Sequence, residues 1–514
     1  MLTEAGAKTL RDAGSSPSSV GEPVARAVPF SADEEGSPRQ TQWWTNEGIY
    51  LGYSTEPADD EMHPLRSEWV LTGNLTRYRH DRHVLTIGPN GSGKTRRLLF
   101  PNLYMLKGWS IVAIDPKGEL FAHTAMERAK SSGHRVILID PFSVVRTNYP
   151  KLAQHFPCES AGFNPVAALD PESPRFIDDA KSLAIALIRT DENRDKYWPQ
   201  AAQTLIKGLI MGLRIRGGWE ASLVDLRNVL GLAPEELASH VAKTIERLGS
   251  EWPALSASLG EFKTHSDGDR ELGGIRRTAK VQTDWLDSPQ MRVDLEGNAI
   301  DFASLKTRPT TVYLVLPPEF LASHGIWLRM MVASILRPLL RSASGPLVPV
   351  LFMLDEFAQL GRMEIIEDNY ALMRGYGIKL WTIWQDLNQA KNLYAERWES
   401  FISNAGMVQS FAPQDMTTRK YLSDLADERL TWHTRTADSG GLSLSKGGPS
   451  IQSNDSRSDT HVKEPLMYPY ELGQMGQGQS VVFTQRGEVR RVYFPDAAVM
   501  PRVREMMAEA VELC

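Results

Sequence analysis

Short apolar runs recur along the chain, and most of them end in a loop that carries glycine, proline or a carboxylate. Such runs are typical of strands buried on both faces of a parallel sheet. A turn signal at 485–489 predicts a hairpin near the end of the chain. The pattern as a whole indicates an α/β fold. The strands are predicted at residues 84–87, 110–114, 135–139, 311–316, 350–354, 379–384, 407–411 and 480–484.

The spacing of apolar residues changes between the third and fourth of these strands. Residues 178–188, 200–215 and 223–230 have helical periodicity, and strand signals are scarce around them. We therefore predict a mostly helical insertion in an α/β domain. The predicted organisation is a disordered leader at 1–40, an α/β domain at 41–170 plus 301–514, an all-α domain at 171–300, and a mobile Gly/Ser-rich loop at 436–460.

Length and composition narrow the class of protein. A chain of 514 residues is expected to hold two or three domains, and a net charge of −6 does not favour a general nucleic-acid coat protein. Cys158 and Cys514 are the only cysteines, which argues against a disulfide framework and suits a reducing cytoplasm. The most apolar windows are shorter than a membrane span and contain charged residues, so no transmembrane helix is expected.

The octapeptide GPNGSGKT after the first strand fits the phosphate-binding loop motif. Its glycines let backbone N–H groups point at phosphate oxygens, Lys94 can reach the β- and γ-phosphates, and the Thr95 hydroxyl can ligate Mg²⁺. The alternative is a chance glycine-rich turn. The predicted loop comprises Gly88, Pro89, Asn90, Gly91, Ser92, Gly93, Lys94 and Thr95.

Two acids follow the strand at 350–354, and the two motifs together outline a site for a nucleoside triphosphate and Mg²⁺. Asp355 stands where open α/β sheets bind ligands, and there it can hold Mg²⁺ through its hydration shell. Glu356 is the natural base to orient a water on the γ-phosphate. The alternative is an acidic pair that stabilises the start of the next helix.

Three further polar residues are candidates for the same site. Gln385 ends the strand next along the chain and can contact the γ-phosphate, or it can be a solvent-facing amide. Arg82 precedes the phosphate-loop strand and Arg374 follows the acidic pair. Either arginine can bring a guanidinium to a phosphate in the same subunit or in a neighbour, or be a solvated surface residue.

Several ordered motifs together resemble a known family. The chain is similar to the type IV secretion coupling proteins, the TraG/TraD-type ATPases of bacterial conjugation, over about residues 70–495. The resemblance implies a RecA-like P-loop NTPase domain with an inserted all-α domain, and it supports Lys94, Asp355, Glu356, Gln385, Arg82 and Arg374 as site residues. The motifs are IGPNGSGKT, AIDPKGEL, FNPVAAL, KYWPQAAQTLI, MLDEFAQLGRM, WTIWQDLNQ, FISNAGMVQSF and EPLMYPYELGQM.

The resemblance also implies a function and partners. Family members are thought to act as hexamers that bring DNA, or relaxase-bound DNA and protein substrates, to a type IV secretion channel. Typical members carry two N-terminal membrane helices, a pattern that this sequence lacks. The resemblance therefore implies a variant located in the cytoplasm, or held at the inner membrane by a partner, and monomeric in the absence of DNA or that partner.

The same motifs are compatible with two other functions, and the sequence also suggests residues that could contact DNA. A docking adaptor could bind nucleotide without hydrolysing it, although Glu356 argues against that, and a general DNA translocase or helicase could use the same motor. If DNA passes through a ring, phosphate contacts by inward loops supply the affinity. The candidate contacts are Lys263, Arg270, Arg276, Arg277 and Lys280 in the helical insertion, and Lys446 and Arg457 in the predicted loop.

Overall fold

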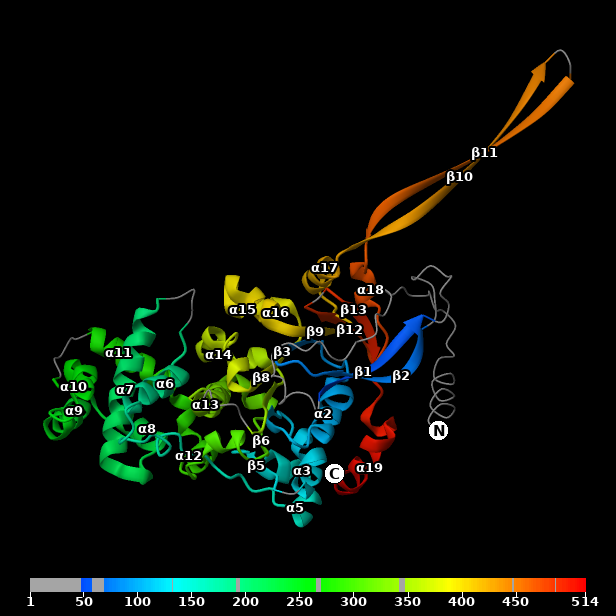
Figure 1. Ribbon diagram of the computed structural model, residues 1–514. Coiled ribbons are helices and arrows are strands. Elements are labelled where there is room, and N and C mark those ends of the chain that lie inside the picture. The colour runs from blue at the N-terminus through cyan, green and yellow to red at the C-terminus, as the bar shows by residue number, and fades with distance from the viewer. Residues whose placement is uncertain are drawn as a thin grey trace.

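A large sheet forms the middle of the molecule, with a group of helices at one end and a long two-stranded ribbon at the other (Figure 1). The computed structural model describes residues 48–57, 69–131, 133–190, 195–264, 270–341, 347–445, 448–485 and 487–514. The leader predicted at 1–40 lies outside these residues.

The strands of the sheet follow the order β2-β1-β13-β12-β9-β3-β8-β7-β4-β6-β5, and all neighbours from β9 to β5 run parallel. Each of these parallel strands coincides with a predicted apolar run to within two residues, which confirms those predictions. The parallel strands are β9 (Ala405–Phe411), β3 (His83–Ile87), β8 (Ile378–Trp384), β7 (Val350–Leu354), β4 (Ser110–Ile114), β6 (Thr310–Leu314) and β5 (Arg135–Ile139).

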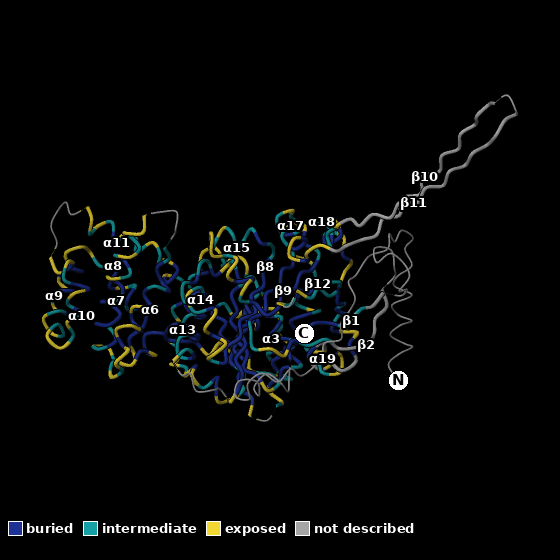
Figure 2. Tube along the Cα trace, turned by 45° about the horizontal axis from the view of Figure 1, so that its top comes forward, coloured by how far each residue is buried: buried dark blue, intermediate teal, exposed yellow. Residues whose placement is uncertain are grey.

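The parallel strands are mostly apolar because helices cover both faces of the sheet. Along β3, Val84 packs in a cluster with α2 (Phe100–Met105), α3 (Glu119–Lys130) and α19 (Pro501–Leu513). Leu85 packs in a second cluster, which contains α13 (Leu321–Leu339) and the helical end of the molecule. Successive residues of a strand face opposite sides, so burial of both faces favours a nearly continuous apolar run. Figure 2 shows this concentration of buried residues in the strands.

Antiparallel strands extend the sheet beyond β9. The predicted hairpin turn at 485–489 joins β12 (Gln479–Thr484) to β13 (Val489–Tyr493), and β13 pairs with β1 (Ile49–Pro57), which pairs with β2 (Trp69–Tyr78). The sequence pattern did not reveal β1 and β2. The apolar residues of β1 are concentrated at its start, and polar residues follow. Its place in the sheet depends on pairing Tyr53 with Tyr493, a residue near the other end of the chain.

Every described element between Phe176 and Leu295 is helical. Close packing here depends on small residues: a Cβ added to Gly208 of α7 would lie 2.6 Å from the Leu259 side chain. We keep 171–300 as the proposed bounds of the inserted all-α domain. Its helices are α6 (Phe176–Leu187), α7 (Tyr197–Gly217), α8 (Leu223–Gly231), α9 (Pro234–Leu248), α10 (Pro253–Leu259), α11 (Arg270–Gln282) and α12 (Pro289–Leu295).

Shorter helices complete the α/β part. They are α4 (Val144–Asn148), α5 (Leu152–His155), α14 (Glu364–Asn369), α15 (Leu387–Tyr394), α16 (Glu399–Asn404), α17 (Met416–Leu425) and α18 (Pro469–Gly473). In the part of the chain that the structure describes, no helix has both the length and the apolar character needed to cross a membrane.

The prediction of a loop at 436–460 is wrong. The backbone there forms β10 (Glu428–Ser445) and β11 (Gly448–Pro465), which pair antiparallel along their whole length and extend away from the sheet (Figure 1). Composition misled the prediction, since a ladder of backbone hydrogen bonds can hold a Gly/Ser-rich segment in strand conformation without an apolar face. The ribbon leaves the body of the molecule between α17 and α18.

Candidate active site at the carboxyl edge of the sheet

The predicted phosphate loop lies directly after β3, and the Gly88 N–H donates to the Trp384 carbonyl at 2.8 Å. Gly91 and Gly93 have φ angles of +79° and +81°, a region that glycine adopts without steric cost. A Cβ at Gly88 would lie 2.9 Å from the Lys94 side chain, so a larger residue there would require that side chain to shift. The chain then enters the π-helical turn η1 (Thr95–Leu99), which leads into α2.

Lys94 is the cation of the site. Its side chain is 8% exposed, and Nζ donates to the carbonyl oxygens of Gly88 at 2.6 Å and Pro89 at 3.3 Å. The ammonium is therefore folded back over its own loop, where neutral carbonyls are its hydrogen-bond acceptors.

Asp355 and Glu356 follow β7 at the same edge of the sheet. Burial raises the pKa of Asp355 to about 6, with the Lys94 charge acting against this shift and the Glu356 charge adding to it. Glu356 has a φ angle of +53°, which is uncommon outside glycine and often marks a functional residue. Its backbone N–H donates to Asp355 Oδ1 at 3.1 Å.

Gln385, directly after β8, is brought to the acidic pair. Its Nε2 donates to Glu356 Oε2 at 2.7 Å, and its backbone N–H donates to Gln389 Oε1 at 3.1 Å. The structure thus brings this half-buried amide to the acidic pair, with Glu356 as its partner.

The structure does not bring Arg82 and Arg374 to this site. Arg82 precedes β3, and Arg374 lies in the turn η8 (Met373–Tyr376) that precedes β8. Because β3 and β8 are parallel and the phosphate loop follows β3, both arginines lie at the opposite, amino edge. Five strand residues span about 16 Å. In this chain both arginines thus lie away from the phosphate loop, and their use at the site of a neighbouring subunit stays our prediction.

Sequence reasoning assigned no role to the loop after β4. Asp115 is 1% exposed, burial raises its pKa to about 7, and its Oδ2 accepts from the Phe121 N–H at 2.8 Å. Glu119, in the first turn of α3, raises the pKa of Asp355 through its charge. The sequence contained the signal that could have identified this loop. Asp115 follows a buried strand, as Asp355 does, and parallel strands end at the same edge of a sheet.

The arginines after Thr95 were also missed. Arg97 Nη1 donates to the Phe494 carbonyl at 2.6 Å, and Arg96 Nε lies 3.1 Å from Asp496 Oδ2. Both contacts tie the turn after the phosphate loop to the segment that follows β13. Only the tertiary structure shows these pairs, since their members are about 400 residues apart.

The residues present fit a nucleotide with Mg²⁺. Among the described residues, Ser92 Oγ is buried and lacks a hydrogen-bond partner, as a hydroxyl that faces phosphate oxygens would. Lys94 supplies a positive charge beside glycine N–H groups, and half-buried Thr95 and Asp355 are oxygen ligands of the kind that Mg²⁺ prefers. These residues remain our prediction for the nucleotide site.

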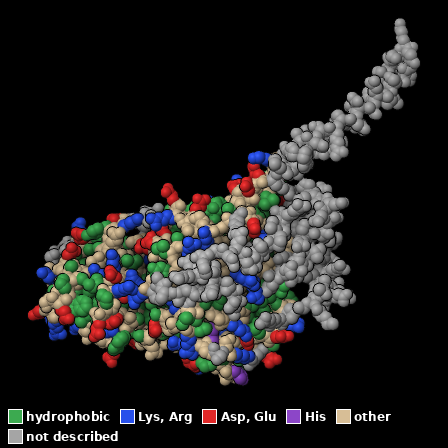
Figure 3. Space-filling model, viewed as in Figure 1, with side chains coloured by type: hydrophobic (Ala, Val, Ile, Leu, Met, Phe, Trp, Pro, Cys, Tyr) green, Lys and Arg blue, Asp and Glu red, His purple; other side chains and the backbone are tan. Residues whose placement is uncertain are grey.

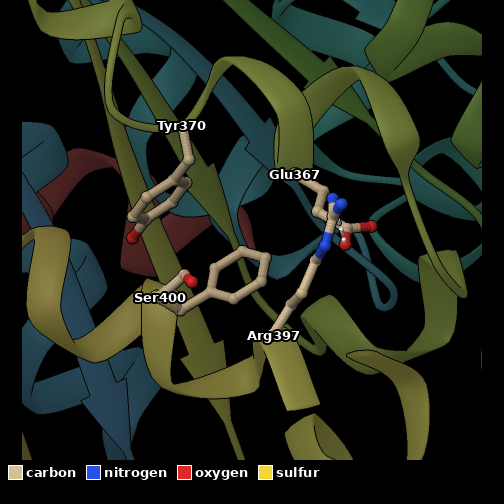
Figure 4. A pocket seen from close by; sticks show the side chains of 5 residues that line it. Glu367, Tyr370, Arg397 and Ser400 are labelled. Carbon is tan, nitrogen blue, oxygen red and sulfur yellow. Dashed lines mark hydrogen bonds and ion pairs between the residues drawn. The ribbon is translucent and has the colours of Figure 1, made fainter. Parts of the chain in front are cut away.

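The segment after Glu356 is anchored by an ion-pair cluster. Glu367 of α14 accepts from Arg362 Nε at 2.7 Å and lies 3.1 Å from Arg397 Nη1. Figure 4 shows Glu367 and Arg397 on one side of a cavity of about 200 Å³ that Tyr370 and Ser400 also line. The cluster fixes α14 to the turn before α16, and the cavity is separate from the phosphate loop.

The candidate DNA contacts are dispersed. Arg276 of α11 donates to the carbonyl oxygens of Leu230 and Leu232, so it fastens the end of α8. Lys446 and the side chain of Arg457 lie outside the described residues. On the face shown in Figure 3, basic and acidic side chains are interspersed over the helical end. The remaining candidates Lys263, Arg270, Arg277 and Lys280 belong to the helical insertion and stay predictions.

Comparison with known proteins gives one consistent result. A family model described as Type IV secretory system Conjugative DNA transfer matches residues 53–509. A conjugal transfer protein TraG of Escherichia coli is 26% identical over 453 residues, which cover 84% of this chain and 66% of that protein. A type IV secretion system-coupling protein VirD4 of Bartonella henselae is 25% identical over 436 residues, covering 83% and 64%. The chain thus spans just under two thirds of these relatives.

Solved structures show the same fold. The unbound bacterial conjugative coupling protein TrwBdeltaN70 superposes with a TM-score of 0.61 at 15% identity, covering 81% of this chain and 85% of that one. TrwB in complex with ADP and Mg²⁺ superposes with a TM-score of 0.55 at 14% identity and the same coverage. The fold is that of a RecA-like P-loop NTPase with an inserted all-α domain.

Proposed function

The chain belongs to the type IV secretory system conjugative DNA transfer family, and on that premise we propose that it is a Mg²⁺-dependent ATPase that couples DNA, or relaxase-bound DNA, to a type IV secretion channel. One observation supports the ATPase most strongly. Gln385 Nε2 lies 2.7 Å from Glu356 Oε2 at the edge of the sheet that also carries Lys94 and Asp355. Names of relatives support the transfer role, and the TrwB complex supports ADP and Mg²⁺ as ligands.

Each side chain has a role in ATP hydrolysis on this proposal. Lys94 exchanges its carbonyl partners for the β- and γ-phosphates, where a charge-assisted hydrogen bond is stronger. Thr95 and Asp355 hold Mg²⁺, which when bound neutralises charge on the β- and γ-phosphates. Glu356 orients the attacking water and accepts its proton. Gln385 holds the Glu356 carboxylate in position until the γ-phosphate offers it another partner.

A ring is part of the proposal. Arg82 and Arg374 lie at the amino edge of the sheet, so they reach a phosphate only in a neighbouring copy. We therefore propose a homo-hexamer in the working state, with a monomer in the absence of DNA or a membrane partner. Sedimentation of the purified protein with and without single-stranded DNA and ATP measures both states. A monomer under all conditions, with full ATP turnover, would contradict the ring.

Lys94→Ala tests the whole proposal. The purified variant should release no phosphate from ATP, and a mating assay should show no transfer of a plasmid that depends on this protein, because the β- and γ-phosphates lose their cation. Lys151→Ala, an exposed lysine before α5, is the matched control and should behave as wild type. Normal transfer by the Lys94→Ala variant would refute the proposal.

Two alternatives give different results in the same assays. A nucleotide-binding docking adaptor would hydrolyse ATP slowly, without stimulation by DNA, and would still bind its substrate. A DNA translocase or helicase unconnected with secretion would hydrolyse ATP, yet its deletion would leave plasmid transfer intact. Membrane fractionation of cells with and without the secretion channel tests the proposed peripheral attachment to the inner membrane, since the attachment should require the channel.

A further inference from the structure

Arg189 lies at the junction between the helical end and the α/β part of the molecule. It follows α6 and precedes α7, and the residue is half-buried. Burial lowers the pKa of its guanidinium, which shows that protein encloses this group. Arg189 belongs neither to the nucleotide site nor to the DNA contacts predicted from the sequence, so its side chain needs an account of its own.

Two glycines make room for the Arg189 guanidinium. A Cβ on Gly325 of α13 would lie 3.1 Å from Nη2, which is closer than an ordinary van der Waals contact. A Cβ on Gly361 would lie 3.9 Å from Cζ and from Nη1. The guanidinium therefore lies beside helix α13 and beside the backbone at Gly361, where it occupies the space that larger residues would fill.

One hydrogen-bonded turn separates Gly361 from the catalytic acid. The turn η7 (Phe357–Leu360) has Glu356 before its first residue and Gly361 after its last. The Gln359 N–H donates to the Glu356 carbonyl at 2.8 Å, and the Gly361 N–H donates to the Ala358 carbonyl at 3.1 Å. The apolar side chains at both ends of the turn are fully buried. A displacement at Gly361 is thus passed on to Glu356.

The helical end holds the backbone of the same junction. Gln282, the last residue of α11, accepts from the Arg189 N–H at 2.5 Å and donates to the Arg189 carbonyl at 3.1 Å. Gln203 of α7 donates to the Ile188 carbonyl at 3.0 Å. Two helices of the insertion therefore fix the backbone at Arg189, while its side chain reaches the turn after Glu356.

The residue after Arg189 makes a second contact with the catalytic segment. Thr190 Oγ1 donates to Glu364 Oε1 at 3.0 Å, and Glu364 is the first residue of α14. The junction thus meets the segment at Gly361 and again three residues later. Two contacts restrict the orientation of the segment, whereas a single one would let it pivot.

We propose that Arg189 is a positioning residue for Glu356, through which the helical end sets the orientation of the turn η7. Arg189 acts by packing at the end of this turn and does not touch the nucleotide. The proposal rests on the proposed function only in the role of Glu356 as the base, because the contacts of Arg189 do not depend on that role.

Gly325→Ala tests the packing of the guanidinium without changing a polar group. The added methyl must displace Nη2, and it favours the helix because alanine has the higher helix propensity. The variant should keep the wild-type KM for ATP and lose about 10-fold in kcat, since a misplacement of about 1 Å can cost about 100-fold. Gly273→Ala in α11, whose new methyl would have nothing within 4 Å, is the matched control. A wild-type kcat in both variants would overturn the proposal.

Combination with Arg189→Ala separates the guanidinium from the other neighbour of the new methyl. The Gln359 carbonyl oxygen would lie 3.4 Å from that methyl, an ordinary van der Waals distance. Because Gly325→Ala acts through the guanidinium on this proposal, it should cost no further kcat once Arg189 is replaced. Arg189→Lys, which keeps a charge but not the planar fork, should have a kcat between those of wild type and Arg189→Ala. Additive losses in the double variant would overturn the proposal.

Hydrogen exchange followed by mass spectrometry reports on the turn without ATP hydrolysis. The amides of Gln359 and Gly361 are protected by hydrogen bonds within the turn, so Arg189→Ala should speed exchange in a peptide covering residues 355–362. Gln282→Met removes both hydrogen bonds to the Arg189 backbone and should speed exchange in the same peptide. Unchanged exchange in Arg189→Ala would overturn the positioning role, and unchanged exchange in Gln282→Met alone would overturn the role of the helical end.

The proposed function and the positioning role can fail separately. Faster exchange in Arg189→Ala, together with no ATP hydrolysis by the wild-type protein, would refute the proposed function alone. ATP hydrolysis that is lost in Glu356→Gln and unchanged in Arg189→Ala would refute the positioning role alone.

Discussion

The two edges of the parallel sheet carry different chemistry. At the carboxyl edge, Lys94, Glu356 and Gln385 lie beside one another, within one chain, and hydrogen bonds join Glu356 to Gln385 and Lys94 to its own loop. At the amino edge lie Arg82 and Arg374, which have the right chemistry for a phosphate but lie at the opposite end of the strands from the phosphate loop.

The amino edge also contains buried polar groups with structural partners. Lys379 Nζ donates to the His80 carbonyl at 2.5 Å and lies 4.6 Å from the centre of the Tyr78 ring. His83 Nε2 lies 2.5 Å from the Tyr370 carbonyl oxygen, and burial lowers the pKa of this histidine to about 4. The comparison teaches that one edge brings polar groups from distant segments together, whereas the polar groups of the other edge contact the surrounding structure.

The largest expected effect tests whether the amino edge acts in a neighbour. Arg374→Ala should lower ATP turnover by about 10³- to 10⁵-fold if its guanidinium stabilises the charge on a transferred phosphoryl group. Mixing this variant with Glu356→Gln should restore part of the activity, because some interfaces then combine an intact Arg374 with an intact Glu356. Steady-state phosphate release measures both. Arg79→Ala, an exposed arginine at the same edge, is the control, and no recovery on mixing would contradict action across subunits.

The next effect concerns the base at the carboxyl edge. Glu356→Gln should lower ATP turnover by about 10²- to 10⁴-fold and leave nucleotide binding intact, because the amide cannot accept the proton of the attacking water. Phosphate release and binding of a fluorescent ATP analogue separate the two effects. Normal turnover would move the role of base to another residue, and Glu119, whose charge acts on Asp355, would be tested next.

A smaller effect is expected for the partner of that base. Gln385→Ala removes one hydrogen bond to a carboxylate, worth about 1.5–3 kcal/mol, so turnover should fall about 10- to 100-fold. Gln389→Ala, which removes only the bond to the backbone of Gln385, should cost less. Pre-steady-state phosphate release compares the two variants. An equal loss of turnover in the two variants would show that turnover depends on the position of the Gln385 backbone and not on its contact with Glu356.

The smallest effect concerns the stability of the amino edge. Burial lowers the pKa of Lys379 to about 7 from 10.5. Because the folded pKa is below the unfolded one, the unfolded chain binds more protons between these values, and stability should rise with pH there. Below about pH 7 both states are protonated and the cost of burying the charge is present in full. The free energy of unfolding of wild type, relative to Lys379→Met, should rise by up to about 1.4 kcal/mol per pH unit.

Urea unfolding followed by tryptophan fluorescence between about pH 7 and pH 10 measures that difference. Lys391→Met is the matched control, because Lys391 lies 4.6 Å from the Trp398 ring on the outer helix α15 and is not buried in the sheet. A difference between wild type and Lys379→Met that does not change with pH would show that the ammonium stays charged, held by the His80 carbonyl and the Tyr78 ring.

The parallel strands and the carboxyl-edge motifs could be predicted because their chemistry is local. A strand covered on both faces is apolar at most positions, so β3, β4 and β7 are visible in a short window of sequence. The ribbon β10–β11 could not be predicted in this way. Its strands are specified by pairing with each other, as in Thr436 with Arg457, and not by an apolar face.

The sequence by itself determined the fold class, the phosphate loop, the acidic pair and the glutamine at the end of β8. These features depend on residues close together in the sequence. They also depend on the rule that the carboxyl ends of parallel strands lie at the same edge of a sheet. Only the tertiary structure decided which edge each arginine occupies, that Gln385 contacts Glu356, and that Arg189 lies beside Gly361. Those facts depend on the order of strands in the sheet and on helix packing, which bring together residues that are far apart along the chain.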